Sequence, residues 1–556
     1  MMSAFRQNSY LFGGNAPFVE ELYESYLQNP ASVDEAWRTY FDNLQSLPAS
    51  DGSTETRDVA HAPIVQSFAE RARSGALQPQ QMGGNIETAR KQVHVAQLIA
   101  AYRWLGSRHA DLDPLKRLDR PDIPELSPSF YGFTEGDHAH IYSAANTFFG
   151  LDNAPLRDIL QALRETYCST IGAEFMHMSD PAAKRWIQER LETARGRFGF
   201  DADTKKRILE RLTAAEGLER YLHTRYVGQK RFSLEGGESF IAAMDTLVRE
   251  GGKHGLQEMV IGSAHRGRLN LLVNVLGKMP KDLFAEFEGK HASDLPSGDV
   301  KYHQGFSSDV STPGGPMHLS LAFNPSHLEI VSPVVEGSTK ARQVRRGDRN
   351  GSDVLSVLVH GDAAFAGQGV VMETLNLTET RGYGTRGTVH LVINNQIGFT
   401  TSDTRDSRST LYCTDVVKSI EAPVFHVNGD DPEAVVFVTQ LALDYRMKFR
   451  KDVVVDIVCF RKLGHNEQDT PSVTQPLMYK RINVHPGTRK LYADRLEAQG
   501  TIEKGYADHL VTAFRDAHDL GGEYVLWTGT HEPRKNLSGV LGAFRLLSRA
   551  HPEVDL

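Results

Sequence analysis

Two near-continuous apolar runs in the middle of the chain predict strands buried on both faces of a parallel sheet. The first run covers residues 354–359 and stops at Gly361 and Asp362, and the second covers residues 389–393 and stops at Asn394 and Asn395. The stretch between them, residues 367–382, opens and closes with glycine and is predicted to form a helix. Together they predict a βαβ unit whose polar tips meet at the carboxyl edge of the sheet, where open α/β sheets bind ligands.

The two polar tips carry oxygen donors of different charge. Asp362 offers a carboxylate and Asn395 a neutral amide carbonyl, and Mg²⁺ commonly takes one or two carboxylates and leaves its remaining positions to phosphate and water. Gly367 and Gly369 allow a close approach of an anion to the start of a helix, where free N–H groups favour phosphate. The pattern therefore predicts a cradle for magnesium and a diphosphate.

A third apolar segment, residues 259–261, predicts another buried strand that ends just before His265 and Arg266. This places a histidine and two arginines, Arg266 and Arg268, at the same sheet edge as Asp362 and Asn395. Arginine offers paired donors to a diphosphate or a carboxylate, so a functional role is favoured for His265 and Arg266, and an ion pair within the fold is the alternative for one of the two arginines. Two later strands are predicted within residues 422–435 and 452–469, and each again ends in polar residues.

Residues 298–309 and 323–338 are predicted to be polar loops on this scaffold, where binding residues concentrate. Histidines and a serine in these and neighbouring segments are candidates for the site, with solvated, capping or structural roles as the alternatives. His177 lies among apolar residues and is expected to be structural. The other candidates are His303, Ser307, His327, and His465 beside Arg461.

The three glycines Gly382, Gly384 and Gly387 have the spacing of a dinucleotide-binding fingerprint. Such a fingerprint must follow a strand and open a helix. Here the glycines follow a predicted helix and precede a strand, so the segment is predicted to be an ordinary loop.

The pattern also divides the chain into segments. Residues 1–47 show two short amphipathic helices, the second with a capping box formed by Ser32 and Glu35, and a disordered tail is the alternative. Residues 48–85 have a linker composition, residues 86–205 are predicted to be helical, and residues 206–526 to form the α/β domain. The segments predict a tethered amino-terminal arm, a helical region and an α/β domain with a mostly parallel sheet and flanking helices.

Composition narrows the class of protein. The chain has 556 residues, of which 40% are hydrophobic, and a net charge of −8, which argues against nucleic acid as the main partner. The apolar runs are all shorter than the 18 residues of a membrane span. Three cysteines without a CxxC pair predict neither zinc nor a disulfide framework. A cytoplasmic or mitochondrial-matrix-like location is expected.

The motifs GDAAFAGQG at residues 361–369 and VINNQIGFTTS at residues 392–402 resemble the magnesium and thiamine diphosphate motif of one family. This family is the decarboxylating first component of the 2-oxoglutarate dehydrogenase complex. The resemblance implies that Asp362, Asn395 and the backbone carbonyl of Ile397 hold Mg²⁺, and that Arg266 and Ala363 contribute to the cofactor site. The resemblance also implies substrate-binding and catalytic roles for His265 and His303 and a substrate contact at Ser307.

The same resemblance implies oxidative decarboxylation of 2-oxoglutarate in the tricarboxylic acid cycle, with transfer of the succinyl group to a lipoyl group. The expected partners are a lipoyl-bearing succinyltransferase and a dihydrolipoyl dehydrogenase, the amino-terminal arm being implicated in their binding. A homodimer is expected. The family has glutamate where Thr470 stands, which puts only local salt bridging in doubt.

The resemblance extends over about residues 9–526 and is lost in residues 527–556. We therefore expect this chain to be the diphosphate-binding half of such an enzyme, without the aminopyrimidine-binding domain. Two alternatives remain open from the sequence. One is a non-catalytic fragment that binds the partners of the complex, and the other is a different thiamine diphosphate enzyme, such as a transketolase-like protein.

Overall fold

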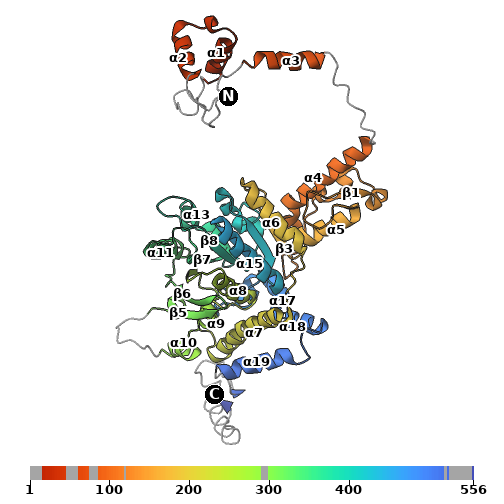
Figure 1. Cartoon of the computed structure of the whole chain (residues 1–556). Coiled ribbons are helices and arrows are strands. Elements are labelled where there is room, and N and C mark those ends of the chain that lie inside the picture. The colour runs from red at the N-terminus through yellow and green to blue at the C-terminus, as the bar shows by residue number, and fades with distance from the viewer. Residues whose placement is uncertain are drawn as a thin grey trace. The chain divides into compact units, whose positions relative to one another are not determined.

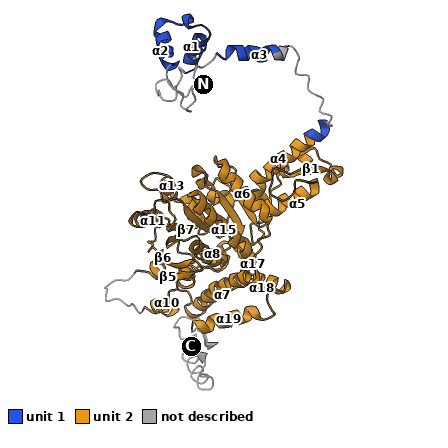
Figure 2. Ribbon diagram, viewed as in Figure 1, with its two compact units in different colours: residues 1–89 blue, residues 90–556 orange. Residues whose placement is uncertain are grey.

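A computed structural model describes residues 16–45, 60–73, 86–117, 120–289 and 299–518, together with two short strands near the carboxyl terminus. The chain divides into two compact units, Met1–Ala89 and Arg90–Leu556 (Figure 2). Each unit is described by itself. Among the described residues, no helix has the length and apolar character needed to cross a membrane.

The first unit is built on a small aromatic core. Tyr23, Tyr26 and Phe41 pack their rings together, with centroids 5.0 to 6.0 Å apart, and Val19 and Val33 complete the cluster. The apolar spacing that predicted two amphipathic helices is thereby confirmed. The elements of this unit are α1 (Ala16–Gln28), η3 (Pro30–Ser32), α2 (Glu35–Gln45) and α3 (Ala62–Arg73).

Two details of the predicted arm are wrong. Helix α2 is capped by Asp34, whose Oδ1 accepts a hydrogen bond from the backbone N–H of Trp37 at 3.0 Å, whereas the hydroxyl of Ser32 donates to the carbonyl of Ser25 at 2.9 Å. Ser32 lies one 3₁₀ turn too early to cap α2. Helix α3 also occupies part of the predicted linker, and the rest of that linker lies outside the described residues.

The second unit is organised around an eight-stranded sheet with the order β3-β9-β10-β8-β7-β4-β6-β5. The six central strands are parallel, and the two edge strands are antiparallel to their neighbours. The predicted α/β class with a mostly parallel sheet is confirmed. The strands are β3 (Ile171–Glu174), β4 (Glu258–Ser263), β5 (Phe306–Thr312), β6 (Gly315–Leu321), β7 (Val354–Gly361), β8 (Thr388–Asn394), β9 (Val424–Asn428) and β10 (Val453–Val458).

Helices cover both faces of this sheet (Figure 1). Along β7, Leu355 and Val357 face the large core shared with α8 and α15, whereas Leu358 faces a second cluster with Val335 of α11. This two-sided burial explains the unbroken apolar runs. The helices are α4 (Ile86–His109), α5 (Leu156–Tyr167), α6 (Pro181–Ala194), α7 (Ala202–Arg225), α8 (Ser239–Lys253), α9 (Arg268–Asn274), α10 (Pro280–Phe287), α11 (Val331–Arg346), α12 (Asp362–Gly367), α13 (Gly369–Leu375), α14 (Thr404–Ser407), α15 (Pro432–Phe449), α16 (Pro471–Thr474), α17 (Pro476–Ile482), α18 (Thr488–Ala498) and α19 (Tyr506–Ala517).

Short elements complete the second unit. The described residues also form two small sheets. Residues 86–205, which were predicted to be helical, contribute both strands of one small sheet and edge strand β3 of the main sheet. The prediction of an entirely helical region is therefore wrong. The 3₁₀ helices and remaining strands are η4 (Pro124–Leu126), η5 (Pro128–Tyr131), η6 (Glu135–Ala139), η7 (Lys301–His303), η8 (Cys413–Ile420), β1 (Ile141–Ser143), β2 (Asn153–Pro155), β11 (Glu523–Tyr524) and β12 (Val554–Asp555).

The helix predicted for residues 367–382 differs from the structure in both position and length. Helix α12 begins already at Asp362, the extended backbone of Gln368 interrupts the path, and α13 ends at Leu375. The side-chain amide of Asn376 donates to the carbonyl of Met372 at 2.8 Å, which satisfies a helix-end acceptor and favours termination. The three spaced glycines lie in the turns between α13 and β8, as predicted.

The two predicted polar loops are also corrected. Strand β5 begins at Phe306 and forms an antiparallel hairpin with β6, and α11 begins at Val331. The side chains of Val331 and Val335, one helical turn apart, are buried against Val260 and Val354. In both segments, polar residues on the outer face obscured the apolar residues that hold the element in place.

Candidate active site

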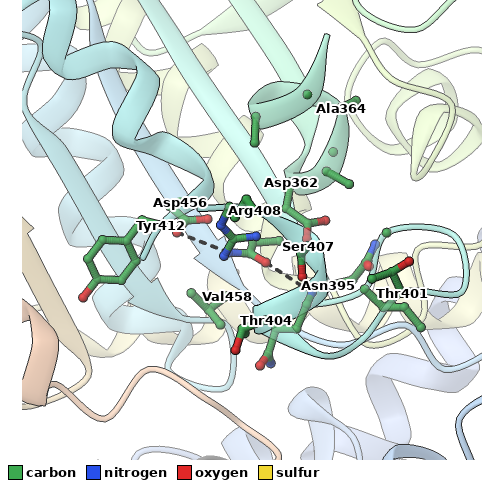
Figure 3. A pocket seen from close by; sticks show the side chains of 18 of the residues that line it. Asp362, Ala364, Asn395, Thr401, Thr404, Ser407, Arg408, Tyr412, Asp456 and Val458 are labelled. Carbon is green, nitrogen blue, oxygen red and sulfur yellow. Dashed lines mark hydrogen bonds between the residues drawn. The ribbon is translucent and has the colours of Figure 1, made fainter. Parts of the chain in front are cut away.

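A cavity of about 1330 Å³ lies at the carboxyl edge of the parallel strands. Its wall includes Asp362, the first residue of α12 after β7, and Asn395, the residue that follows β8 (Figure 3). The predicted meeting of the two polar tips is therefore confirmed. Because β7 and β8 are parallel neighbours, their carboxyl ends bring the aspartate and the asparagine together.

Asp362 is a buried carboxyl group, with only 5% of its surface exposed. Burial and the nearby carboxylate of Asp456 together raise its pKa to about 7, against the guanidinium of Arg408 and local backbone N–H groups, which lower it. A buried carboxylate next to a second one binds a cation favourably, because the cation relieves both the desolvation and the repulsion.

Asn395 supplies the neutral donor that the sequence predicted. Its side chain is buried, and its Oδ1 accepts no hydrogen bond from the part of the chain that the structure describes. The turn beyond it is fixed by Gln396, which has φ +62° and donates to Asp113 at 2.8 Å and to the carbonyl of Cys459 at 2.9 Å. Ile397 lines the cavity directly after this turn. An unpartnered amide oxygen beside a buried carboxylate fits a magnesium ion.

Arg266 lines the same cavity, but its guanidinium is already engaged. It donates to the carbonyl of Ser233 at 2.7 Å and to that of His465 at 2.9 Å. Burial lowers its pKa to about 10, with a further contribution from the positive charge of Arg461. The side chain thus ties two loops together at the cavity wall, and a role in holding a diphosphate stays a prediction.

The predicted histidines lie side by side. The ring centroids of His265 and His303 are 5.2 Å apart, and the buried Nε2 of His265 has no hydrogen-bond partner within the described residues. Burial lowers the pKa of His265 to about 4, helped by His303 and Arg268, so its imidazole is neutral at pH 7. The Nε2 of His303 contacts the hydroxyl of Ser326 at 3.0 Å.

Other candidates from the sequence fall in different places. Ser307 is exposed on strand β5 and does not line the cavity, and neither does the exposed His327. His465 does line it, while Arg461 donates to the carbonyl of Phe399 at 3.1 Å. His177 contacts the carbonyl of Ala422 at 2.9 Å, which suits the structural role expected for it.

Asp456 is among the cavity residues that were missed from the sequence. Asp456 lies in β10 and is fully buried, yet it lines the cavity. A signal was available, because a single charged residue in the otherwise apolar run of residues 453–458 needs a partner or a function.

Comparison with known proteins assigns the family. Residues 210–515, more than half of the chain, match the family described as "Dehydrogenase E1 component". The chain belongs to this family. Residues 8–47 match a second family, described as "2-oxoglutarate dehydrogenase N-terminus".

Three similar curated relatives carry the name "2-oxoglutarate dehydrogenase E1 component". The protein from Cupriavidus necator is 69% identical over 521 residues, which is 94% of this chain and 55% of the relative. The protein from Azotobacter vinelandii is 53% identical over 97% of this chain and 56% of the relative, and that from Haemophilus influenzae is 48% identical over 93% and 54%. The chain spans about half the length of these relatives.

Proposed function

We propose that this chain provides the magnesium- and diphosphate-binding part of an enzyme that decarboxylates 2-oxoglutarate oxidatively with thiamine diphosphate. The observation that carries the proposal is the pairing of Asp362 with the unpartnered Oδ1 of Asn395 at one cavity wall. The names of the relatives support 2-oxoglutarate as the substrate, and they favour this function over that of a transketolase-like enzyme.

In this proposal each residue of the cavity has a distinct task. Asp362, Asn395 and the carbonyl of Ile397 hold Mg²⁺, and Ala363 and Arg266 border the diphosphate. Thiamine diphosphate supplies the electron sink for the loss of CO₂, and the protein supplies binding and orientation.

The two histidines would serve the substrate. The neutral His265 offers its free Nε2 to a substrate carboxylate or to a proton in transfer. Both ring nitrogens of His303 have partners, Asp299 at 2.9 Å and Ser326 at 3.0 Å, so its proposed role needs one of these contacts to be exchanged for the substrate. Ser307 lies outside the cavity wall, so its proposed substrate contact needs a movement of β5 or of a ligand toward it.

The proposal extends to the assembly that the family resemblance implies. The succinyl group is transferred to the lipoyl group of a succinyltransferase, and a dihydrolipoyl dehydrogenase completes the cycle. The match of residues 8–47 to the amino-terminal family supports a role of this arm in the complex. The proposal includes a homodimer in the cytoplasm, in line with the bacterial origin of the relatives.

Calorimetric titration of the purified chain with Mg²⁺ and thiamine diphosphate tests the binding proposal. Asp362→Ala removes the anionic ligand and is expected to weaken binding at least 100-fold. Asp494→Ala is the control, because Asp494 forms an exposed ion pair with Lys490 at 2.9 Å on α18, outside the cavity wall. Equal binding by the wild type and Asp362→Ala contradicts the proposed site.

Decarboxylation tests the chemistry separately. Release of CO₂ from 2-oxoglutarate is measured with thiamine diphosphate, Mg²⁺ and an artificial electron acceptor, and Asp362→Ala serves as the inactive reference. Turnover by the wild type alone supports the full proposal. Tight cofactor binding without turnover by this chain restricts it to the cofactor-binding part of the enzyme.

A further inference from the structure

Asp456 is an isolated charge in the centre of the sheet. It lies in β10 in register with Val392 of β8, and two residues later Val458 pairs with Asn394 at the end of that strand. Its side chain is therefore deeper in the sheet than Asp362 and Asn395, while it still lines the same cavity. Figure 3 shows the three side chains in one view of the cavity.

The two oxygens of this carboxylate have different surroundings. Oδ2 accepts hydrogen bonds from Nδ1 of His426 at 2.7 Å and from the amide of Asn394 at 3.3 Å. Oδ1 is buried and has no hydrogen-bond partner among the described residues. An orphaned carboxylate oxygen at a cavity wall calls for a donor or a cation.

A buried ion network fixes the orientation of Asp456. The ring of His426 is fully buried, and its Nε2 donates to Glu174 at 3.0 Å. Burial opposes the charge of His426, but the hydrogen bonds to Asp456 and Glu174 outweigh it and raise its pKa to about 9. The ring of Tyr412 stacks on it at 4.0 Å, and Lys418 contacts Glu174 at 2.9 Å.

This network leaves one oxygen of Asp456 facing the cavity without a donor. His426 and Lys418 offset the charges of Asp456 and Glu174, so the acceptor that Asp456 presents to the cavity is the unpartnered Oδ1. Asp362 and Asn395 line the same cavity as Asp456, and Arg408 is one of the cations in its wall. Two carboxylates and the free amide oxygen of Asn395 therefore converge on the same space.

We propose that Asp456 is a positioning residue of the cation site, whose Oδ1 accepts a hydrogen bond from a water molecule bound to the metal ion held by Asp362 and Asn395. Magnesium takes few carboxylates directly and retains several waters, and Asp456 lies two residues below the strand end that carries the direct ligands. The inference rests on the proposed function. Loss of such an outer partner typically reduces metal affinity about 10- to 100-fold.

The test measures Mn²⁺ binding in the presence of inorganic diphosphate, with free Mn²⁺ determined by electron paramagnetic resonance. Asp456→Asn keeps the shape of the side chain and removes its charge, and a 10- to 100-fold weaker affinity is expected. Asp430→Asn is the matched control, because Asp430 is also bonded to a histidine, His485 at 2.8 Å, outside the cavity. Its Mn²⁺ affinity should equal that of the wild type.

Asp362→Ala separates the inference from the proposed function. If Asp362→Ala abolishes binding and Asp456→Asn binds as tightly as the wild type, the inference fails and the proposed site stands. If the wild type binds Mn²⁺ no more tightly than Asp362→Ala, the proposed function itself is contradicted. If Asp456→Asn and Asp430→Asn weaken Mn²⁺ binding equally, the loss reflects a general loosening of the fold. This result would also overturn the inference.

A second measurement needs no variant. Electron-nuclear double resonance of Mn²⁺ bound to the wild-type chain detects the exchangeable protons of a metal-bound water. The inference requires at least one such water in the diphosphate complex, and its absence overturns the proposed hydrogen bond even if Asp456→Asn does not fold.

Discussion

Gly398 approaches Ala363 so closely that a side-chain Cβ at Gly398 would lie 2.8 Å from the Cβ of Ala363. These residues follow the two candidate metal ligands, since Ala363 comes directly after Asp362 and Gly398 three residues after Asn395. The contact therefore sets how closely the turn after β8 approaches the start of α12. The size of two neighbouring side chains controls the geometry of the site.

Gly398→Ala is expected to push this turn away from α12. Overpacking of this kind costs about 1–3 kcal/mol, and we expect Mn²⁺ affinity to fall about 10-fold, since 1.4 kcal/mol corresponds to a factor of ten. The double variant Gly398→Ala with Ala363→Gly removes the clashing methyl group and should recover most of the affinity. Titration of both variants with Mn²⁺ and diphosphate checks this, and additive losses in the double variant would contradict it.

The parts of the site that the sequence predicted depend on strands buried on both faces. The apolar residues of β7 and β8 indicate strands buried on both faces of a sheet. The polar residues that follow these strands, Asp362 and Asn395, then lie at one edge of that sheet. This inference needs only the parallel order of neighbouring strands. It does not depend on the rest of the fold, which explains why it was correct.

The errors arise where tertiary contacts override local pattern. The break at Gln368 divides a segment that sequence treats as one helix, and β3 joins the sheet from a region that is mainly helical, because its partner β9 lies more than 250 residues away. Asp456 was missed because its role depends on His426 and Glu174, which come from two other strands. Single-segment patterns contain no information on such long-range pairs.

The low pKa of His265 predicts a specific loss of stability in acid. Its pKa is about 4 in the folded chain and 6.5 in the unfolded chain, so the unfolded state binds more protons between these values. Folding stability contributed by the neutral imidazole is complete above pH 6.5 and is lost as the pH falls toward 4. The difference between the folded and unfolded pKa values corresponds to about 3 kcal/mol of folding free energy for this one histidine.

His265→Gln removes this titration and should flatten the fall of the free energy of unfolding between pH 6.5 and 4. Urea unfolding at several pH values provides the measurement. His327→Gln is the control, because His327 is exposed and lies outside the cavity wall. An identical acid dependence in wild type and His265→Gln would show that another group causes the loss.

The cap of α2 gives a test within the amino-terminal unit. Asp34 accepts the hydrogen bond from the N–H of Trp37, so Asp34→Ala is expected to destabilise this unit by about 1 kcal/mol, the usual cost of a lost N-cap. Ser32→Ala removes the residue that the sequence favoured as the cap and should cost less. Thermal unfolding followed by the fluorescence of Trp37 ranks the two, and a larger effect at Ser32 would contradict the assignment.

Arg446 joins the amino ends of the central strands, at the opposite edge of the sheet from the cavity. It is fully buried, and its guanidinium donates to the carbonyls of Gly387 at 2.9 Å, Val354 at 3.3 Å and Thr385 at 3.4 Å, and to that of Gly351. Burial lowers its pKa to about 9. Gln343 also donates to the carbonyls of Val354 and Thr385, and Arg450 donates to that of Gly351. Among the described residues, Arg446 is therefore the only side-chain donor to the carbonyl of Gly387.

Arg446→Met fills a similar volume but leaves these carbonyls without the guanidinium. The carbonyl of Gly387 loses its side-chain donor, and one buried group without a partner costs about 1–3 kcal/mol, so the free energy of unfolding should fall by about that amount. Arg405→Met, at an exposed ion pair, should change it by less than about 0.5 kcal/mol. Because Arg446 lies far along the strands from Asp362, Mn²⁺ affinity of the folded variant should be unchanged. If Arg446→Met is as stable as the wild type, the prediction is contradicted. Water molecules would then replace the guanidinium at these carbonyls, and the amino ends of the strands would be accessible to solvent.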